Sequence, residues 1–293
     1  MEHQTKNWYD KNYKLLMAIP ILIMILSLVY LSIFYSKHND FILKDVSLSG
    51  GTTITLNGDF DSVQLEQKLK EKFQDISFRK LSDMGSGKHL ALIIESPLSS
   101  EELIPAIEAI INAKLDEKNS SMEFSGPSLS QSFYKQLLFA FIISFILMSI
   151  VIIIMFRTII PSFAVIFAAF SDIVMPLALL NLLGMKISAA GIAAFLMLIG
   201  YSVDTDILLT TRALKNREGT LNSRIYRAFK TGILMTSTAL LAVLPAFFFI
   251  TGLPDSFRQI FLILALGLFA DIINTWLTNA GIIKWYCESK GIK

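Results

Sequence analysis

The stretch Gly200-Tyr201-Ser202-Val203-Asp204-Thr205-Asp206 lies inside a long apolar segment, 187–209, and this combination decides the class of the protein. As a helix, the segment is long enough to span the roughly 30 Å hydrocarbon core of a membrane. A charged side chain at the centre of a bilayer costs about 2.5–3.5 kcal/mol, so intramembrane carboxylates persist where they face a packed interior or a wet cavity. The two aspartates therefore predict either an ion or proton path or a hydrogen-bonded contact between helices.

The composition of the chain agrees with a membrane protein. Hydrophobic residues make up 53% of the 293 residues, and charged residues make up 17%, below the roughly 25% of average proteins. The net charge of +2 gives no indication of nucleic-acid binding. Cys287 is the only cysteine, which excludes a disulfide within the chain. We interpret it as an isolated thiol, with palmitoylation or a redox role as alternatives.

Six apolar segments are long enough to cross a membrane as helices. The first is too long for the apolar region of a signal peptide and lacks a small-residue cleavage site, so we expect an uncleaved helix. The predicted spans are 15–35, 137–156, 161–183, 187–209, 231–250 and 257–283. They predict an α-helical polytopic membrane protein with six transmembrane helices.

The distribution of Lys and Arg predicts the orientation. These residues cluster in the N-terminal segment, at Arg157, in 212–230 and in the C-terminal tail, whereas the opposite short loops carry only Lys186 and Arg258. The positive-inside rule then places both termini in the cytoplasm and the chain in the cell membrane. We interpret 212–230 mainly as a topology signal, with binding of anionic lipid or of a ribosome as the alternative.

Residues 37–130 are mixed and well charged, which indicates a separate domain outside the membrane. Alternating and helical patterns predict strands at 45–56, 76–81, 88–95 and 121–126, and helices at 61–73 and from 99 or 100 to about 115. This order is βαββαβ, an α+β ferredoxin-like pattern. We therefore expect an N-terminal segment with the first helix (1–36), an extracytoplasmic ferredoxin-like domain (37–130), a five-helix membrane domain (131–286) and a tail (287–293).

Two local signals refine this domain. Gly50-Gly51 interrupts the first strand and predicts a bulge or a close approach of backbone. The pair lacks the Lys-Ser/Thr and the helix of a phosphate-binding loop, so we expect no nucleotide there. Ser99 or Ser100 is expected to cap the second helix, with Glu102 as a capping-box partner.

Every predicted helix from the third to the sixth carries polar residues at membrane depth, which indicates a shared polar interior. Besides Asp204 and Asp206, these are Asp172, Thr236, Ser237, Asp271 and Asn274. For these five we expect a supporting role, in which they hold helices together by hydrogen bonds. Asp271 and Asn274 are three residues apart and share one helix face.

Asp204 and Asp206 are predicted to face different directions. Two residues correspond to about 200° around a helix, so the pair cannot serve one site together. Asp204 lies deeper and one turn after Gly200, where a small residue lets a neighbouring helix approach closely. We expect Asp204 to face the interior, where it either handles protons or holds helices together. Asp206 is expected near the boundary, close to water or to Arg212.

These features resemble the SecF members of the SecD/SecF family of protein-export membrane proteins, in the form seen in archaea. The family belongs to the resistance-nodulation-division superfamily of transporters. Asp45–Thr52, with Gly50, Gly51 and Thr52, is similar to its G-I-D-F-x-G-G-T segment, and Phe124-Ser125-Gly126-Pro127 to its V-G-P. Ser171-Asp172 matches an H/S-D pair. The segment from Gly200, Tyr201 and Ser202 to Asp206, followed by Arg212, resembles the signature of the fourth helix.

The resemblance implies a complex with SecD beside the protein-conducting Sec channel, in contact with exported unfolded polypeptide and with membrane lipid. It also implies use of the proton gradient through a carboxylate in the fourth helix and a basic residue early in the fifth. Asp204 and Asp206 both remain candidates for the carboxylate. The usual arginine early in the fifth helix has no clear match: Lys230 is the nearest basic residue, and the alternative is that Gly232 occupies the position. No catalytic residues, cofactor or metal are implied, so we expect no enzyme.

Two alternatives remain. One is half of another transporter of the same superfamily, which exports lipid or small molecules. The other is an intramembrane aspartyl protease, but its Gly-x-Gly-Asp motif is replaced by Gly-Tyr-Ser-Val-Asp in this chain.

Overall fold

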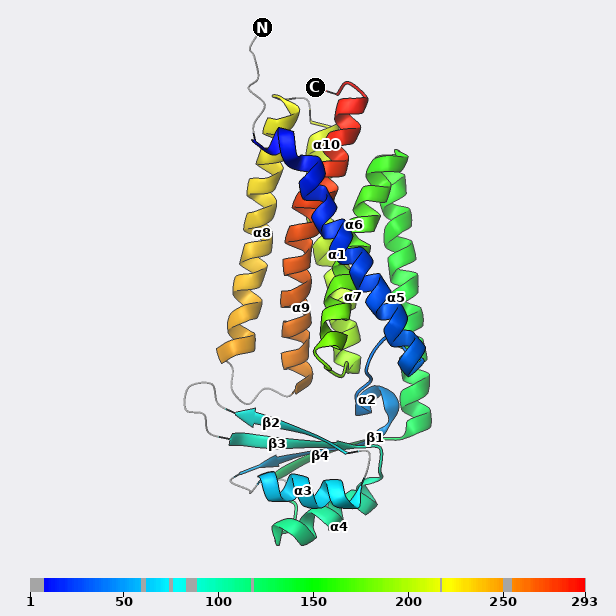
Figure 1. Cartoon of the computed structure of the whole chain (residues 1–293), viewed down its shortest axis with the longest axis vertical. Coiled ribbons are helices and arrows are strands. Elements are labelled where there is room, and N and C mark those ends of the chain that lie inside the picture. Colours follow the sequence, from blue (N-terminus) through cyan, green and yellow to red (C-terminus); the bar gives the residue numbers. More distant parts are fainter. Residues whose placement is uncertain are drawn as a thin grey trace.

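The protein is described by a computed structural model that covers residues 8–58, 62–73, 76–82, 89–116, 119–216, 218–249 and 255–292. A bundle of long helices stands on a small sheet that is backed by two short helices (Figure 1). The bundle consists of α1 (Trp8–His38), α5 (Pro127–Phe156), α6 (Ile159–Leu182), α7 (Ala189–Leu214), α8 (Leu221–Phe249), α9 (Asp255–Ile273), the π-helix η1 (Asn274–Asn279) and α10 (Ala280–Ser289).

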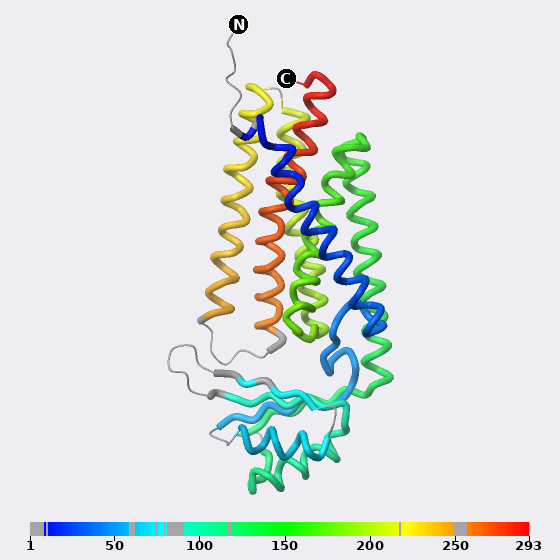
Figure 2. The backbone as a smooth tube through the Cα atoms, in the orientation of Figure 1, coloured from blue at the N-terminus to red at the C-terminus, as the bar shows by residue number. Residues whose placement is uncertain are grey.

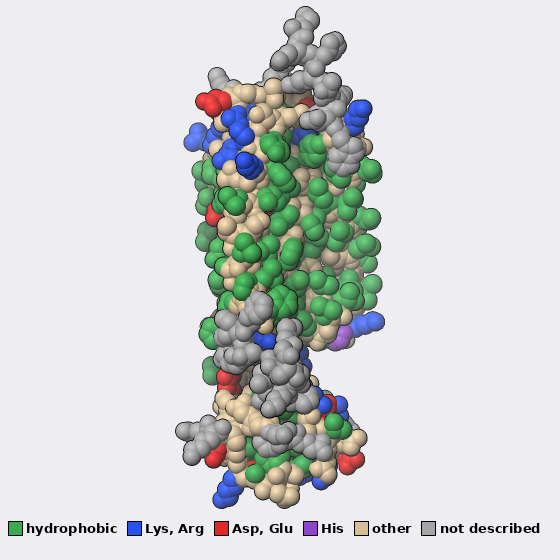
Figure 3. Space-filling model, turned by 90° about the vertical axis from the view of Figure 1, so that its left-hand side faces the viewer, with side chains coloured by type: hydrophobic (Ala, Val, Ile, Leu, Met, Phe, Trp, Pro, Cys, Tyr) green, Lys and Arg blue, Asp and Glu red, His purple; other side chains and the backbone are tan. Residues whose placement is uncertain are grey.

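Six helical spans in the described part are long and apolar enough to cross a membrane, which confirms the predicted number. The last span joins α9, η1 and α10 into one continuous rod, 257–289. On the face shown in Figure 3, hydrophobic side chains cover the bundle, and Lys and Arg gather at the end away from the sheet. The chain is therefore a multi-pass membrane protein. The turn predicted at 251–256 lies largely outside the described residues.

The helices differ in how deeply they are packed. More than half of α6, of α7 and of the α9–α10 rod is buried, whereas α5 and α8 are mostly exposed. α6, α7 and α9 therefore form the centre of the bundle. The beginning of α1 and the end of α10 lie at the bundle end away from the sheet (Figure 2). We call this the termini end and the opposite one the sheet end. Which end faces the cytoplasm stays a prediction.

The small sheet has the strand order β2-β3-β1-β4, and all three pairings are antiparallel. The four strands and the helices next to them are α2 (Val46–Ser49), β1 (Gly51–Asn57), α3 (Ser62–Lys72), β2 (Ser77–Ser82), β3 (His89–Ser96), α4 (Ser100–Ile111) and β4 (Ser120–Ser125). α3 and α4 cover the sheet face that points away from the bundle (Figure 1). Ile54, Ile94, Leu69 and Ile107 are fully buried between these layers. The turn predicted at 83–87 lies outside the described residues, and the predicted domain boundaries stay predictions.

Two predicted elements are wrong in extent. The expected strand 45–56 begins only at Gly51, because the Asp45 side chain accepts a hydrogen bond from the Ser47 amide (2.5 Å) and starts the short helix α2. The helix expected to reach about 115 ends at Ile111, where Asn112 adopts a left-handed conformation with φ of 52°. Ser99 precedes this helix but makes no side-chain capping bond, so the capping box is also wrong.

The predicted close backbone approach at Gly50-Gly51 is confirmed. Gly50 has φ of 87° and ends α2, and a Cβ atom there would overlap the backbone of Pro127. A Cβ atom on Gly51 would overlap the carbonyl oxygen of Ser96. Gly50 therefore allows close packing against the start of α5, and Gly51 allows close packing against the end of β3.

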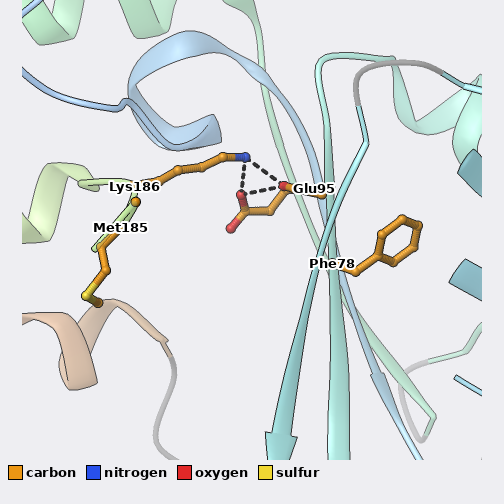
Figure 4. Close-up of a pocket in the computed structure, with 6 residues that line it drawn as sticks. Phe78, Glu95, Met185 and Lys186 are labelled. Carbon is orange, nitrogen blue, oxygen red and sulfur yellow. Dashed lines mark hydrogen bonds and ion pairs between the residues drawn. The ribbon is translucent and has the colours of Figure 1, made fainter. Parts of the chain in front are cut away.

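The loop between α6 and α7 joins the sheet to the bundle. Ile187 exchanges backbone hydrogen bonds with Leu43 and Asp45 (2.6 and 3.1 Å). Lys186 Nζ reaches across to Glu95 Oε2 (2.9 Å) on β3 and to Ser77 Oγ (2.6 Å) on β2 (Figure 4). The contact borders a cavity of about 310 Å³, lined by Ser77, Phe78, Glu95, Gly184, Met185 and Lys186.

Candidate functional site

Three aspartates from three helices meet at the centre of the bundle. Asp172 lies on α6, Asp206 on α7 and Asp271 on α9, and all three side chains are 0% exposed. In the described part of the chain none of them forms an ion pair. We call these residues the carboxylate cluster. Buried charges without a partner are costly, so the surrounding hydrogen bonds decide what the cluster does.

Asp172 is bound from both sides of its carboxyl group. The Ser202 hydroxyl on α7 donates to Oδ2, and the Asn274 amide on η1 donates to Oδ1 (2.6 Å). Asp172 therefore ties α6 to both of its central neighbours. The contact between Asp172 and Asn274 joins α6 to η1, and their supporting role stays a prediction.

Asp271 is surrounded by three hydroxyl groups. Thr205 on α7 and Thr275 on η1 each lie 2.9 Å from Oδ1, and Thr236 on α8 lies 3.3 Å from Oδ2. Hydroxyl groups both donate and accept hydrogen bonds, so this environment accommodates Asp271 with or without a proton. Asp271 and Thr236 thereby link α7, α8 and α9.

Asp206 has one satisfied and one open oxygen. Oδ1 lies 2.6 Å from Asn279 Nδ2 and 2.9 Å from Thr275 Oγ1. Oδ2 is buried and has no hydrogen-bond partner in the described part of the chain, and the same holds for the hydroxyl of Thr210, one turn further along α7. Asp206 is thus the member of the cluster with a carboxylate oxygen free of described hydrogen bonds.

The π-helix explains how one rod contacts all three aspartates. In η1 the hydrogen bonds close over five residues, which widens the turn; such segments occur frequently at functional sites. Asn274, Thr275, Thr278 and Asn279 are all buried, although they occupy neighbouring positions. Asn274 reaches Asp172, Thr275 reaches Asp206 and Asp271, and Asn279 reaches Asp206.

The expected roles of the two aspartates in α7 are reversed. Asp206 faces the interior, whereas Asp204 is exposed on the outer face of the bundle. The predicted angle between them is consistent with this arrangement, but the predicted inner side was wrong. Gly200 is also exposed, and a Cβ atom there would meet no described atom within 4 Å, so the expected close helix approach at Gly200 is absent among the described residues. Arg212 does not pair with Asp206 and instead binds Arg227 O and Thr231 Oγ1 on α8.

The other predicted residues contribute less to this cluster. Lys230 is exposed, and Ser237 is half-buried without a hydrogen bond that joins it to the cluster among the described contacts. Gly232 packs against the ring of Trp276, and a Cβ atom there would overlap the indole. The residues Thr205, Thr275 and Asn279 were missed. Thr205 lies between the two aspartates of α7, and the signal for Thr275 and Asn279 is a run of polar side chains after Asp271. Among the described residues, no group of three or more His, Cys, Asp or Glu side chains is placed to hold a metal ion.

The remaining motif residues lie near the sheet. Gly50 contacts Pro127, Gly126 precedes the first turn of α5, and the buried Thr52 hydroxyl donates to Leu98 O (2.7 Å). Gly50 and Gly126 lie at the connection between the sheet and α5, whereas Thr52 ties β1 to the segment between β3 and α4. Tyr201, by contrast, is half-exposed (50%) on the same outer face of α7 as Asp204.

Comparisons with known proteins agree with this architecture. The family model for the C-terminal region of the SecD/SecF protein-export membrane proteins matches residues 106–289. SecF from Methanolacinia petrolearia is 35% identical, with 97% of this chain and 98% of the relative aligned. SecF from Methanothermobacter thermautotrophicus is 37% identical, with 95% of this chain and 94% of the relative aligned.

A solved structure shares the fold. The crystal structure of SecDF from Thermus thermophilus, described as a translocon-associated membrane protein, superimposes with a TM-score of 0.73 at 18% identity. The alignment covers 98% of this chain but only 39% of the SecDF chain. With the family model and the near full-length relatives, these findings show that the chain belongs to the SecD/SecF family of protein-export membrane proteins.

Proposed function

We propose that the chain is the SecF subunit of a SecDF complex that assists export of unfolded polypeptide across the cell membrane and draws on the proton gradient. The observation that carries the proton step is the carboxylate cluster, in which Asp172, Asp206 and Asp271 are buried without a cation among the described residues. Intramembrane carboxylates of this kind mark proton paths in pumps and transporters.

The hydrogen bonds of the cluster suggest how a proton produces movement. Each aspartate binds groups on other helices, so a change in its protonation changes contacts between helices. One charge that crosses about 100 mV releases ~2.3 kcal/mol. A typical hydrogen bond contributes about 0.5–1.5 kcal/mol, so one proton suffices to exchange one or two of them.

The helix α7 connects this cluster to the sheet. Its first turn is capped by Ser188, whose backbone amide and hydroxyl both donate to Gln259 Oε1 on α9 (2.8 and 2.5 Å). Gln259 Nε2 in turn donates to Lys186 O (2.6 Å), next to the contact with Glu95. A displacement of α7 against α9 therefore reaches the sheet through a short chain of bonds.

The partner SecD is expected on the outer face of α7. Met197, Gly200, Tyr201 and Asp204 form an exposed stripe at helical spacing, and an exposed carboxylate at this depth favours a polar partner over lipid. This chain aligns with only 39% of the SecDF polypeptide, so that polypeptide has enough further residues for a second, SecD-like half.

We further propose that the sheet with α3 and α4 is a ferredoxin-like domain on the extracytoplasmic side. The β-α-β-β-α-β order, the antiparallel strand order β2-β3-β1-β4 and the two helices on one face support this. The Lys and Arg residues at the termini end support a cytoplasmic location for both termini (Figure 3). In this orientation the domain lies where a polypeptide leaves the Sec channel.

The proposal is tested by complementation in a cell that lacks its own copy of this protein. Restoring the full chain should restore secretion of a reporter, and affinity purification should recover SecD. Recovery of another transporter half without SecD, together with unchanged secretion, would favour an exporter of lipid or small molecules and contradict the proposal.

A further inference from the structure

The hydroxyl group of Thr275 lies between two carboxyl groups. Its Oγ1 atom is 2.9 Å from Asp206 Oδ1 and 2.9 Å from Asp271 Oδ1. A hydroxyl group carries a single hydrogen and can donate to only one of these oxygens. The second contact is a hydrogen bond only if that carboxyl group itself donates to Thr275.

Thr205 repeats this arrangement on the other side of Asp271. Its Oγ1 atom is 2.8 Å from the Ser202 carbonyl oxygen and 2.9 Å from Asp271 Oδ1. Because a carbonyl oxygen only accepts, Thr205 can donate to it while Asp271 donates to Thr205. Asp271 Oδ1 carries at most one hydrogen, so when Asp271 donates to Thr275, the Thr205 hydroxyl donates to Asp271 Oδ1 instead of to the Ser202 carbonyl oxygen.

We propose that Thr275 is a proton relay between Asp206 and Asp271, which share one proton. The carboxyl group of Asp271 gives its proton to Thr275 Oγ1, while the hydrogen of Thr275 passes to Asp206 Oδ1. The Asp271 O–H bond breaks, an O–H bond forms on Asp206, and Thr275 regains its hydroxyl. The charge moves from Asp206 to Asp271, and the reverse shift restores it.

The surroundings give the relay a direction. At its termini side, Asp206 Oδ2 is the open oxygen, and Thr210 lies one turn nearer the termini end. At its other side, Asp271 leads through Thr205 and Ser202 to Asp172. Toward the sheet end these groups are followed by an apolar layer that includes Phe195, Leu198 and Ile263. Two buried polar atoms without a described partner thus lie on the termini side of the relay, and an apolar layer lies on its sheet side.

The relay rests on the proposed proton role of the carboxylate cluster, and it has a test of its own. The full chain in lipid nanodiscs is transferred to D₂O, and infrared spectra follow the carbonyl band of the protonated aspartates, assigned with Asp206→Asn and Asp271→Asn. A positioned proton donor accelerates transfer by about 10²–10⁴-fold. We therefore expect deuterium exchange at Asp271 to slow by about 100-fold or more in Thr275→Val, which keeps the shape but lacks the hydroxyl.

Thr275→Ser is the matched control, because it keeps the hydroxyl and should exchange at the wild-type rate. Asp206→Asn should slow exchange at Asp271 as Thr275→Val does, and it provides the answer if the valine variant does not fold. The relay would be overturned if Asp271 in folded Thr275→Val exchanged deuterium at the wild-type rate. It would also be overturned if neither Asp206 nor Asp271 gave the carbonyl band of a protonated carboxyl group.

The relay and the proposed function fail in different ways. If Asp271→Asn abolishes gradient-dependent secretion while Thr275→Val exchanges normally, the relay is wrong and the proposed function stands. If exchange slows in Thr275→Val but secretion is indifferent to Asp271→Asn, the relay stands and the proton step in export is wrong.

Discussion

Replacement of Gly232 by alanine tests how the π-helix is held against the carboxylate cluster. A Cβ atom at this position would overlap the ring of Trp276, which is buried (6% exposed) at the centre of η1. The ring cannot retreat without moving the segment that carries Thr275 and Asn279. We therefore expect Gly232→Ala to displace the groups that bind Asp206.

The magnitude follows from a comparison with Gly200→Ala. Both glycines lie within transmembrane helices, so both substitutions gain the same helix propensity of about 0.8–1 kcal/mol. The added methyl group at Gly200 meets no atom within 4 Å, whereas the one at Gly232 overpacks the interior, which costs typically about 1–3 kcal/mol. The difference in unfolding free energy between the two variants should therefore be about 1–3 kcal/mol.

Denaturant unfolding of the full chain in detergent measures this difference. In a Trp276→Leu background the obstacle is gone, and Gly232→Ala should no longer be less stable than Gly200→Ala. Equal stability of the two single variants in the chain with Trp276 would refute the packing described for η1.

Two further predictions concern the parts outside the membrane. Lys186→Gln and Glu95→Gln should each weaken the contact between sheet and bundle, and a double-mutant cycle of unfolding free energies should give a coupling of about 0.2–1 kcal/mol, since Lys186 is partly exposed; full additivity would show that the pair is not formed. Tyr134→Phe removes a 2.6 Å hydrogen bond to Asp40. Burial alone would raise the pKa of Asp40, but hydrogen bonds from Tyr134 and Lys44 outweigh it and lower the pKa below the ordinary 3.8. The contribution of Asp40 to stability is therefore complete above pH 3.8 and is lost as the pH falls through the lower pKa of the folded state. Tyr134→Phe should lower the unfolding free energy by about 1.5–3 kcal/mol at neutral pH and should make that free energy less dependent on acid pH. An unchanged pH profile of the unfolding midpoint would contradict this prediction.

The helices were predictable because apolar segments of membrane-spanning length have few alternatives. The order of strands and helices in the small domain was also predictable from alternation and helical periodicity. The first half of the strand at 45–56 was not, since Asp45 can cap a helix as well as precede a strand. The side-chain pattern does not distinguish these outcomes; the packing of Gly50 against Pro127 does.

The candidate site was predictable only in part. Polar residues in four successive helices correctly indicated a shared interior, and the helical angle is consistent with Asp204 and Asp206 facing different sides. The inner side depends on which neighbours surround α7, and those neighbours include Thr275 and Asn279 on a π-helix. A π-helix changes which residues share a face, so a reading based on 3.6 residues per turn could not place these two on Asp206.

In the proposed function, proton passage through Asp206 drives export. Its most direct test is secretion of a reporter by cells that carry Asp206→Asn, with the proton gradient present and collapsed, and with Asp204→Asn as the matched variant on the outer face of α7. We expect Asp206→Asn to assemble with SecD and to lose the gradient-dependent part of secretion, whereas Asp204→Asn should weaken recovery of SecD. Normal assembly of Asp206→Asn with unchanged gradient-dependent secretion would contradict the account.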